Sequence, residues 1–306
     1  MDRSRAIGLF LAIPVILVWG ITFVATKALL RDFSALEILF IRYVAAYLAL
    51  WAMCPRRLRV PSHREEVEYL LAGLFGVTVY QFLENAAIHY TTATNVSILV
   101  SICPVFTAAL SQLVLREKAL TRRFLLGFVL ALVGVTMVCL NGVLEVHLNP
   151  LGDLMALGAA VSWACYSTLL SRINARNPDL LASTRRIFFW SLLFMLPLLV
   201  YGVRGPVDAM GGSFHVDLAA AANAARFRSL PNLFNLAFLG LLASAGCFVA
   251  WNSACKRLGT VTATVGIYLI PAITALFAFA FLHERLTAMA AIGAVLTLLG
   301  VFLSGR

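Results

Sequence analysis

The chain has 306 residues, of which 61% are apolar and only 12% are charged, and its formal net charge is +10. A water-soluble globular domain carries about twice that charged fraction, so the composition excludes one. The positive charge could indicate a nucleic-acid partner, but it gathers in alternate loops between long apolar runs, which favours a membrane protein with no nucleic acid bound.

Ten apolar runs follow one another along the chain. A membrane-spanning helix needs roughly 20 residues, within a usual range of about 17–25, and each run is of that size. Two runs contain one internal charge each, Arg42 in the second and Glu84 in the third. In chain order the runs are Ala6–Thr26, Ile38–Cys54, Tyr69–Tyr90, Ala93–Leu115, Phe124–Leu144, Leu154–Ser171, Ile187–Val203, Leu233–Cys255, Leu258–Leu282 and Leu286–Gly305. The predicted fold class is an all-α integral membrane protein with ten transmembrane helices.

The second half of the chain repeats the first. Polar, proline and glycine residues recur at one spacing, which chance matches between apolar segments rarely produce. At a shift of 167 residues, and of 166 after the next loop, the matched pairs are Asn85 and Asn252, Pro104 and Pro271, Glu117 and Glu284, Gly127 and Gly293, and Gly134 and Gly300. We expect repeat one over residues 1–145 and repeat two over residues 150–306. Five spans in each repeat would invert the second relative to the first, as in many alternating-access carriers.

The positive residues predict the orientation in the membrane. With the amino terminus in the cytoplasm, 17 of the 24 Lys and Arg residues lie on the cytoplasmic side and 6 on the other side. Because positive loops stay in the cytoplasm during insertion, we expect both termini there. The glycine pairs of the fifth and tenth runs are seven residues apart and lie on one helix face, which predicts close packing of scaffold helices.

Matched prolines and deep aromatic residues predict a binding region at mid-membrane depth. Proline interrupts a helix and frees a backbone carbonyl, although a plain packing kink is the alternative. Tyr and Trp prefer the membrane interfaces, so rings at mid-depth favour a wet cavity, while core packing is the alternative for any single ring. Such rings bind a flat solute by stacking or an organic cation. The candidate substrate-binding residues are Trp19, Tyr80, Asn85, Ser97, Ser101, Pro104, Trp163, Tyr166, Asn252, Thr264, Tyr268 and Pro271.

Three charges lie within or at the end of predicted spans, namely Lys27, Arg42 and Glu84. A lone charge in hydrocarbon is costly, so such residues pair with each other or face water. The depths of Arg42 and Glu84 agree, and the preferred interpretation is a structural ion pair between them. A role for Glu84 with substrate or proton is the alternative.

The sequence contains no enzyme, metal or phosphate-binding motif that would predict catalysis. We therefore expect neither an enzyme nor a bound cofactor or metal. An intramembrane transferase or lyase is disfavoured by the missing catalytic cluster, and a channel by the interrupted spans.

Each repeat begins with a tryptophan in its first helix and ends in the same pattern. Trp19 and Trp163 are those tryptophans, and the endings read Pro104, Leu115-Arg116-Glu117, Gly127 and Gly134 in one repeat, and Pro271, Leu282-His283-Glu284, Gly293 and Gly300 in the other. Over the whole chain this resembles the EamA family of the drug/metabolite transporter superfamily, and most of all its bacterial exporters of aromatic amino acids.

The resemblance implies a substrate path at the pseudo-twofold axis, lined by residues such as Trp19, Tyr80, Ser101, Trp163 and Tyr268. It implies export of small metabolites, in the first place aromatic or large neutral amino acids, across the bacterial inner membrane. A multidrug or organic-cation exporter is the alternative. The expected partners are a small-molecule substrate and the lipid bilayer, with a monomer as one option. Glu84 departs from the internal symmetry, because its counterpart is Trp251, which leaves the energy coupling open.

Overall fold

The structure is a computed structural model, and it describes residues 3–56, 58–90, 93–140, 149–204, 215–216, 224–282 and 287–305. Within these residues the chain forms helices and turns, and no strand. The elements are α1 (Arg3–Leu29), α2 (Ala35–Met53), α3 (His63–Gly73), η1 (Leu74–Val79), α4 (Tyr80–Tyr90), α5 (Ala93–Val100), α6 (Cys103–Leu110), η2 (Ser111–Leu115), α7 (Arg122–Leu140), α8 (Pro150–Arg176), α9 (Leu180–Arg204), η4 (Ala224–Phe227), α11 (Leu230–Ala237), η5 (Phe238–Gly246), α12 (Cys247–Leu258), α13 (Thr260–Val265), η6 (Gly266–Tyr268), α14 (Leu269–Leu282) and α15 (Ala288–Ser304).

The described residues contain eight helical stretches that are long and apolar enough to cross a membrane. The chain is therefore a multi-pass membrane protein. Two apolar runs of the sequence are not among the eight. Helix α15 is apolar but shorter, and the stretch from α3 to α4 contains Gln81, Glu84 and Asn85, which lower its hydropathy.

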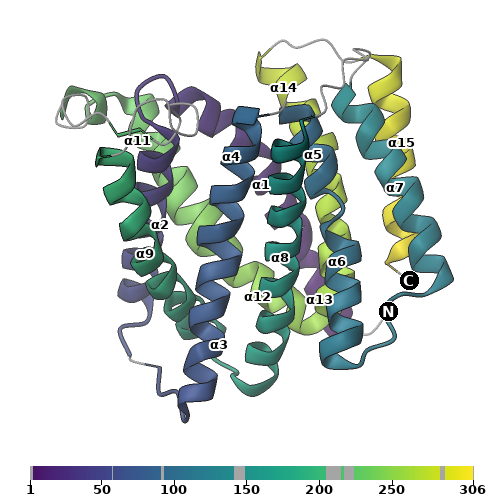
Figure 1. Cartoon of the computed structure of the whole chain (residues 1–306), viewed down its shortest axis with the longest axis horizontal. Coiled ribbons are helices and arrows are strands. Elements are labelled where there is room, and N and C mark those ends of the chain that lie inside the picture. Colours follow the sequence, from purple (N-terminus) through teal and green to yellow (C-terminus); the bar gives the residue numbers. More distant parts are fainter. Residues whose placement is uncertain are drawn as a thin grey trace.

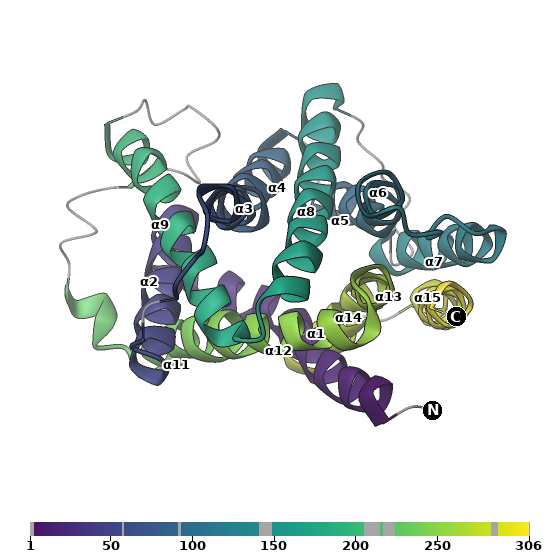
Figure 2. The same ribbon diagram turned by 90° about the horizontal axis from the view of Figure 1, so that it is seen from below.

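The helices stand side by side in one bundle (Figure 1). Helices α7 and α15 pack together at one edge of the bundle, and α2 packs against α9 at the opposite edge (Figure 2). Helix α8 lies in the middle and contacts α3, α4, α5 and α6 from the first half as well as α12 and α13 from the second. The guanidinium of Arg5 donates to the carbonyl of Gly305 at 3.1 Å, so the first and last helices meet on one side of the bundle.

The helices lose α-helical geometry at matched positions in the two halves. The π-helical segment η1 precedes Tyr80, and a shift of 167 residues carries it into the π-helical segment η5. Pro104 and Pro271 follow a turn at residues 101–102 and the 3-10 turn η6, respectively. Each proline lacks the N–H that would bond the carbonyl four residues earlier, at Val100 and Ile267, and the α-helix is interrupted there in both halves. The prediction that both prolines interrupt their helices is confirmed.

Glycines bring the backbones of α7 and α15 into direct contact. A Cβ atom added to Gly134 would lie 2.5 Å from the carbonyl oxygen of Gly293, and one added to Gly127 would lie 2.7 Å from that of Gly300. No other residue type leaves room for this approach, and such contacts are a main source of helix association in lipid. The prediction that the glycine faces of these two helices pack closely is confirmed, and the structure adds that they pack on each other.

A buried asparagine joins α8, α9 and α12. The Nδ2 atom of Asn252 donates to Thr184 Oγ1 at 2.7 Å, and its Oδ1 accepts from the Tyr166 hydroxyl at 3.2 Å. Its backbone carbonyl accepts from Asn174 at 3.1 Å. The matched residue Asn85 instead donates to the Gln81 carbonyl of its own helix at 2.8 Å. Only one of the two repeated asparagines therefore connects helices in this way.

Replacing Gly134 by alanine is expected to destabilise the protein. The new Cβ would lie 2.4 Å from the Thr297 backbone nitrogen and 2.5 Å from the Gly293 carbonyl oxygen, and neither backbone atom can move without shifting α15. Overpacking of this kind typically costs about 1–3 kcal/mol. Thermal unfolding of the purified protein in detergent measures it. Val133→Leu is the control, because Val133 is the neighbouring residue and is 48% exposed. Equal melting temperatures for both variants would contradict close packing.

Asn252→Ala should lower the melting temperature more than Asn85→Ala does. The first change leaves the buried Tyr166 hydroxyl without its acceptor, which costs about 1–3 kcal/mol for an unsatisfied buried group. It also removes the bond to Thr184, although that hydroxyl keeps its bond to the Leu180 carbonyl at 2.7 Å. The second removes only a bond within one turn of α4. The two matched positions thus serve as each other's control in the same unfolding assay, and a larger effect at Asn85 would refute the assignment.

Candidate functional site

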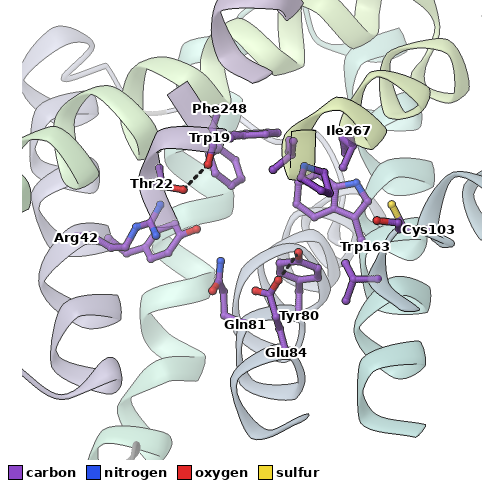
Figure 3. A pocket seen from close by; sticks show the side chains of 15 residues that line it. Trp19, Thr22, Arg42, Tyr80, Gln81, Glu84, Cys103, Trp163, Phe248 and Ile267 are labelled. Atoms are coloured by element: carbon purple, nitrogen blue, oxygen red, sulfur yellow. Dashed lines mark hydrogen bonds between the residues drawn. The ribbon is translucent and has the colours of Figure 1, made fainter. Parts of the chain in front are cut away.

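A cavity with about 890 Å³ of empty space, part of it open to solvent, lies between the two halves of the chain. Its walls come from α1, α2, α4, α5, α6, α8, α12, η6 and α14 (Figure 3). Several of these elements begin or end at the interruptions described above, so the irregular backbone lies at the cavity, as expected where lipid cannot satisfy it.

One wall of the cavity consists of aromatic rings. The Trp163 ring lies 6.0 Å from Trp19, at an interplanar angle of 85°, and 5.2 Å from Tyr80, between ring centroids. The ring of Phe248 lies 5.6 Å from that of Trp19. The indole N–H of Trp19 donates to the Ala243 carbonyl in η5 at 3.1 Å, which fixes this ring on the second half of the chain. The rings form an apolar surface suited to a flat or branched apolar group.

The opposite wall is polar. Arg42 Nε donates to Ser244 Oγ at 2.9 Å, and the Tyr80 hydroxyl donates to Glu84 Oε1 at 3.0 Å. Figure 3 shows Arg42, Gln81 and Glu84 on one side of the cavity, and the Trp19 and Trp163 rings on the other. The cavity is therefore amphipathic across its width.

The expected ion pair between Arg42 and Glu84 is wrong. Both side chains are described and both line the cavity, yet no contact within 4.0 Å joins the guanidinium to the carboxylate. Similar depth in the membrane did not suffice, because the two residues are held by different neighbours. Ser244 holds Arg42 against η5, while Tyr80, one turn earlier on α4, holds Glu84.

Two residues of the cavity wall carry buried polar atoms without a hydrogen-bond partner among the described residues, the hydroxyl of Tyr43 and the indole nitrogen of Trp163. Tyr43 is fully buried and Trp163 is 6% exposed. Buried polar groups in native proteins are nearly always hydrogen-bonded, so these two atoms indicate a place where water or a solute completes the site.

The cavity includes five of the residues proposed from the sequence, namely Trp19, Tyr80, Ser101, Trp163 and Pro271. Six others do not line it, namely Asn85, Pro104, Tyr166, Asn252, Thr264 and Tyr268. Tyr166 and Asn252 belong to the tie between α8, α9 and α12, and the Thr264 hydroxyl donates to the Thr260 carbonyl of its own helix at 2.7 Å. The side chains of Ser97 and Lys27 lie outside the described part of the structure.

Sequence reasoning did not find several residues of the cavity wall, among them Thr22, Tyr43, Gln81 and Phe248. Thr22 is three residues after Trp19 and Gln81 three before Glu84, so helical spacing places each beside a proposed residue. Phe248 is the counterpart of Gln81 at the shift of 167 residues. Helical spacing from Glu84 gives Gln81, and applying the repeat to Gln81 would then have given Phe248.

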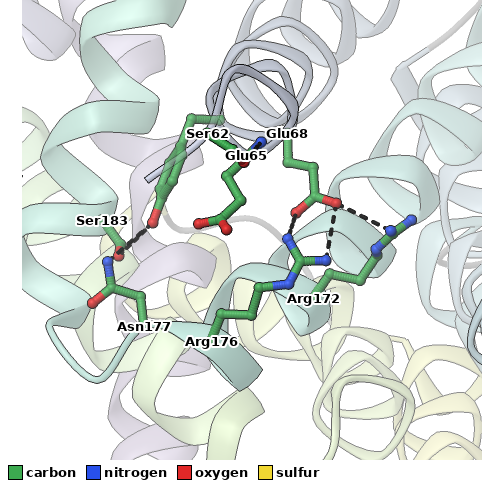
Figure 4. A network of polar contacts seen from close by, with 8 residues as sticks. Ser62, Glu65, Glu68, Arg172, Arg176, Asn177 and Ser183 are labelled. Atoms are coloured by element: carbon green, nitrogen blue, oxygen red, sulfur yellow. Dashed lines mark hydrogen bonds and ion pairs between the residues drawn. The ribbon is translucent and has the colours of Figure 1, made fainter. Parts of the chain in front are cut away.

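Ion pairs join α3 to α8 at the end of the bundle that holds the turn between α8 and α9 (Figure 4), and another ion pair joins α3 to α9. Glu68 accepts from Arg176 at 2.7 Å and from Arg172 at 3.1 Å. Glu66 pairs with Arg186 at 2.7 Å. The hydroxyls of Tyr69 and Ser183 lie 3.2 Å apart in the same region. These contacts hold the three helices together at this end.

Residues 6–140 and residues 150–306 each match the EamA-like transporter family. An uncharacterized transporter of Archaeoglobus fulgidus is 30% identical over 94% of this chain and 93% of its own length. A probable terminal-alkyne amino-acid exporter of Streptantibioticus cattleyicolor is 27% identical over 100% and 95%, and a probable amino-acid metabolite efflux pump of Salmonella typhimurium is 27% identical over 98% and 95%.

A solved crystal structure has the same fold, with a TM-score of 0.73 at 18% sequence identity, over 99% of this chain and 97% of that one. The family match covers nearly the whole chain, and its relatives are named as transporters, exporters and efflux pumps rather than enzymes. The chain belongs to the EamA-like transporter family.

Proposed function

We propose that the protein exports aromatic or large neutral amino acids across the bacterial inner membrane by alternating access. The observation that carries the proposal is the amphipathic cavity between the two halves, with rings on one wall and charged side chains on the other. Two relatives named as an amino-acid exporter and an amino-acid metabolite efflux pump support the substrate class.

We further propose ten transmembrane helices in two inverted repeats. The interruptions at η1 and η5, and before Pro104 and Pro271, fall at matched positions. The glycine contacts support the same symmetry. A twofold rotation that exchanges the repeats maps the contact of Gly127 with Gly300 onto the contact of Gly293 with Gly134. An isologous contact of this kind is the signature of a twofold axis.

In the proposed cycle, the conformation described here is closed at the cytoplasmic end. The ion pairs of Glu68 with Arg172 and Arg176, and of Glu66 with Arg186, hold that end together. Opening toward the cytoplasm would separate α3 from α8 and α9 and break these pairs. The π-helical segments η1 and η5 are the natural hinges, because π-helical turns are rare and often found at functional sites.

An exporter of organic cations is the second candidate. Glu84 and the rings of Trp19, Tyr80 and Trp163 would attract a cation. Arg42 lines the same cavity and would repel one. The amino-acid proposal accounts for both charges, which is why it is preferred.

Transport by the purified protein in liposomes tests the proposal. Unlabelled tryptophan and leucine should inhibit the uptake of labelled phenylalanine. Glycine and tetraethylammonium should inhibit it only weakly. Trp163→Ala should lower phenylalanine uptake by about tenfold, because it removes the ring between Trp19 and Tyr80, and tenfold corresponds to about 1.4 kcal/mol. Trp51→Ala is the control, since Trp51 is 53% exposed and lies outside the cavity. Stronger competition by tetraethylammonium than by tryptophan would favour the cation exporter instead.

The orientation is tested by labelling in intact cells. In a protein with its native cysteines replaced, Arg228→Cys should react with a membrane-impermeant maleimide added outside, and Ser4→Cys should react only after the cells are opened. The reason is the excess of Lys and Arg on the side of the amino terminus. Labelling of Ser4→Cys in intact cells would place the termini outside and reverse the proposed direction of closure.

A further inference from the structure

We infer that Arg42 and Glu84 recognise the two charges of one zwitterionic amino acid, Arg42 binding the α-carboxylate and Glu84 the α-ammonium group. The inference rests on the proposed function, because it concerns the same cavity, and it assigns the part of the substrate that the aromatic wall does not explain.

No ion pair within the described residues neutralises Arg42 or Glu84. Arg42 and Glu84 line one cavity without forming an ion pair, and their hydrogen-bond partners Ser244 and Tyr80 are neutral. Charges at membrane depth are costly and are usually paired, or face a polar path. A solute that carries both charges can pair with both residues at once.

Atoms of both side chains remain available. Ser244 binds the Nε atom of Arg42, and the described residues supply no hydrogen-bond acceptor for its two terminal nitrogens. Those nitrogens suit a carboxylate, which a guanidinium binds through two parallel bonds. Tyr80 donates to Oε1 of Glu84, and no described residue donates to Oε2. That oxygen can accept from an ammonium group.

The arrangement of the walls orients a bound solute. Arg42 on α2 and Glu84 on α4 are on the polar side, with Gln81 between them in the view of Figure 3. The rings of Trp19 and Trp163 lie opposite. An amino acid held by its head group at the polar side would therefore direct its side chain toward the rings. Both charges come from the first repeat, so the substrate binds in one orientation.

This arrangement predicts discrimination against solutes with one charge. An amine without a carboxylate leaves Arg42 unpaired, and an acid without an ammonium group leaves Glu84 unpaired. Sites built around buried polar partners reject analogues that lack one of them far more strongly than apolar pockets reject a missing methylene. Each charged hydrogen bond corresponds to about a tenfold or larger factor in affinity.

The test uses three ligands with one aromatic ring and different head groups: phenylalanine, phenethylamine, which lacks the carboxylate, and phenylpropionate, which lacks the ammonium group. Calorimetry with the purified full-length protein in detergent measures their affinities. Wild type should bind phenylalanine at least about tenfold more tightly than either analogue. Arg42→Gln should lower the affinity for phenylalanine to that for phenethylamine, and leave phenethylamine binding equal or tighter. Glu84→Gln should lower the affinity for phenylalanine to that for phenylpropionate, and leave phenylpropionate binding equal or tighter.

The retained binding of one analogue shows in each variant that the cavity is still folded. Arg42→Lys keeps the charge without the planar fork, and should fall between wild type and Arg42→Gln. If both glutamine variants lose affinity for all three ligands equally, the inference is overturned. The proposed function still stands in that case, provided that the wild-type protein prefers phenylalanine. Wild-type binding of phenethylamine as tight as that of phenylalanine would also overturn it, and would favour the cation exporter. If the wild-type protein neither binds nor transports phenylalanine, the proposed function itself is refuted.

Discussion

The constraint on which the structure depends is that lipid offers no hydrogen-bond partner to a backbone group or a charge. Regular helix satisfies the backbone wherever the chain faces lipid. The described chain departs from it at η1 and η5, and again before Pro104 and Pro271. The turn before Pro104 and the segment η6 contribute Ser101 and Ile267 to the cavity wall, and η1 adjoins the wall residue Tyr80. Because lipid cannot satisfy irregular backbone, the interruptions of the helices and the cavity occur together.

The bundle divides into two parts that differ in how their helices are held together. The direct backbone contact of α7 with α15 leaves no space for sliding, and both helices lie away from the polar wall of the cavity. The helices around the cavity share the main apolar core, which includes Tyr43, Trp163 and Trp251, and polar contacts such as Arg42 with Ser244 are added to that packing. Close glycine contacts occur here too, because a Cβ atom on Gly73 of α3 would lie 2.7 Å from the Ile187 carbonyl oxygen of α9. What sets this part of the bundle apart is the combination of apolar packing with polar ties between helices.

Much of the fold and part of the site could be predicted from the sequence, because they follow from hydropathy, proline chemistry and the repeat. The all-helical class, the interrupted helices and the close packing of the glycine faces need only one-dimensional information, whereas the pairing of α7 with α15 comes from the structure. The sequence does not give the rotation of each helix about its own axis. Asn85 and Asn252 are matched in sequence, but one bonds its own helix and the other joins three helices. The ion pair of Arg42 with Glu84 was predicted from depth alone. Both side chains do face the cavity, but Ser244 holds one and Tyr80 holds the other, and depth alone does not give these partners.

Internal symmetry builds the cavity, but the residues at matched positions make its two walls different. A shift of 167 residues replaces Gln81 by Phe248 and Glu84 by Trp251. The polar side of α4 thus corresponds to an aromatic side of α12, where Phe248 faces the cavity and Trp251 packs behind Trp19 at 5.1 Å. A fully symmetric pair of walls would bind a solute equally well in two orientations. The substitution of rings for an amide and a carboxylate leaves one orientation for a molecule with a charged head and an apolar tail, which is the orientation proposed for the substrate above.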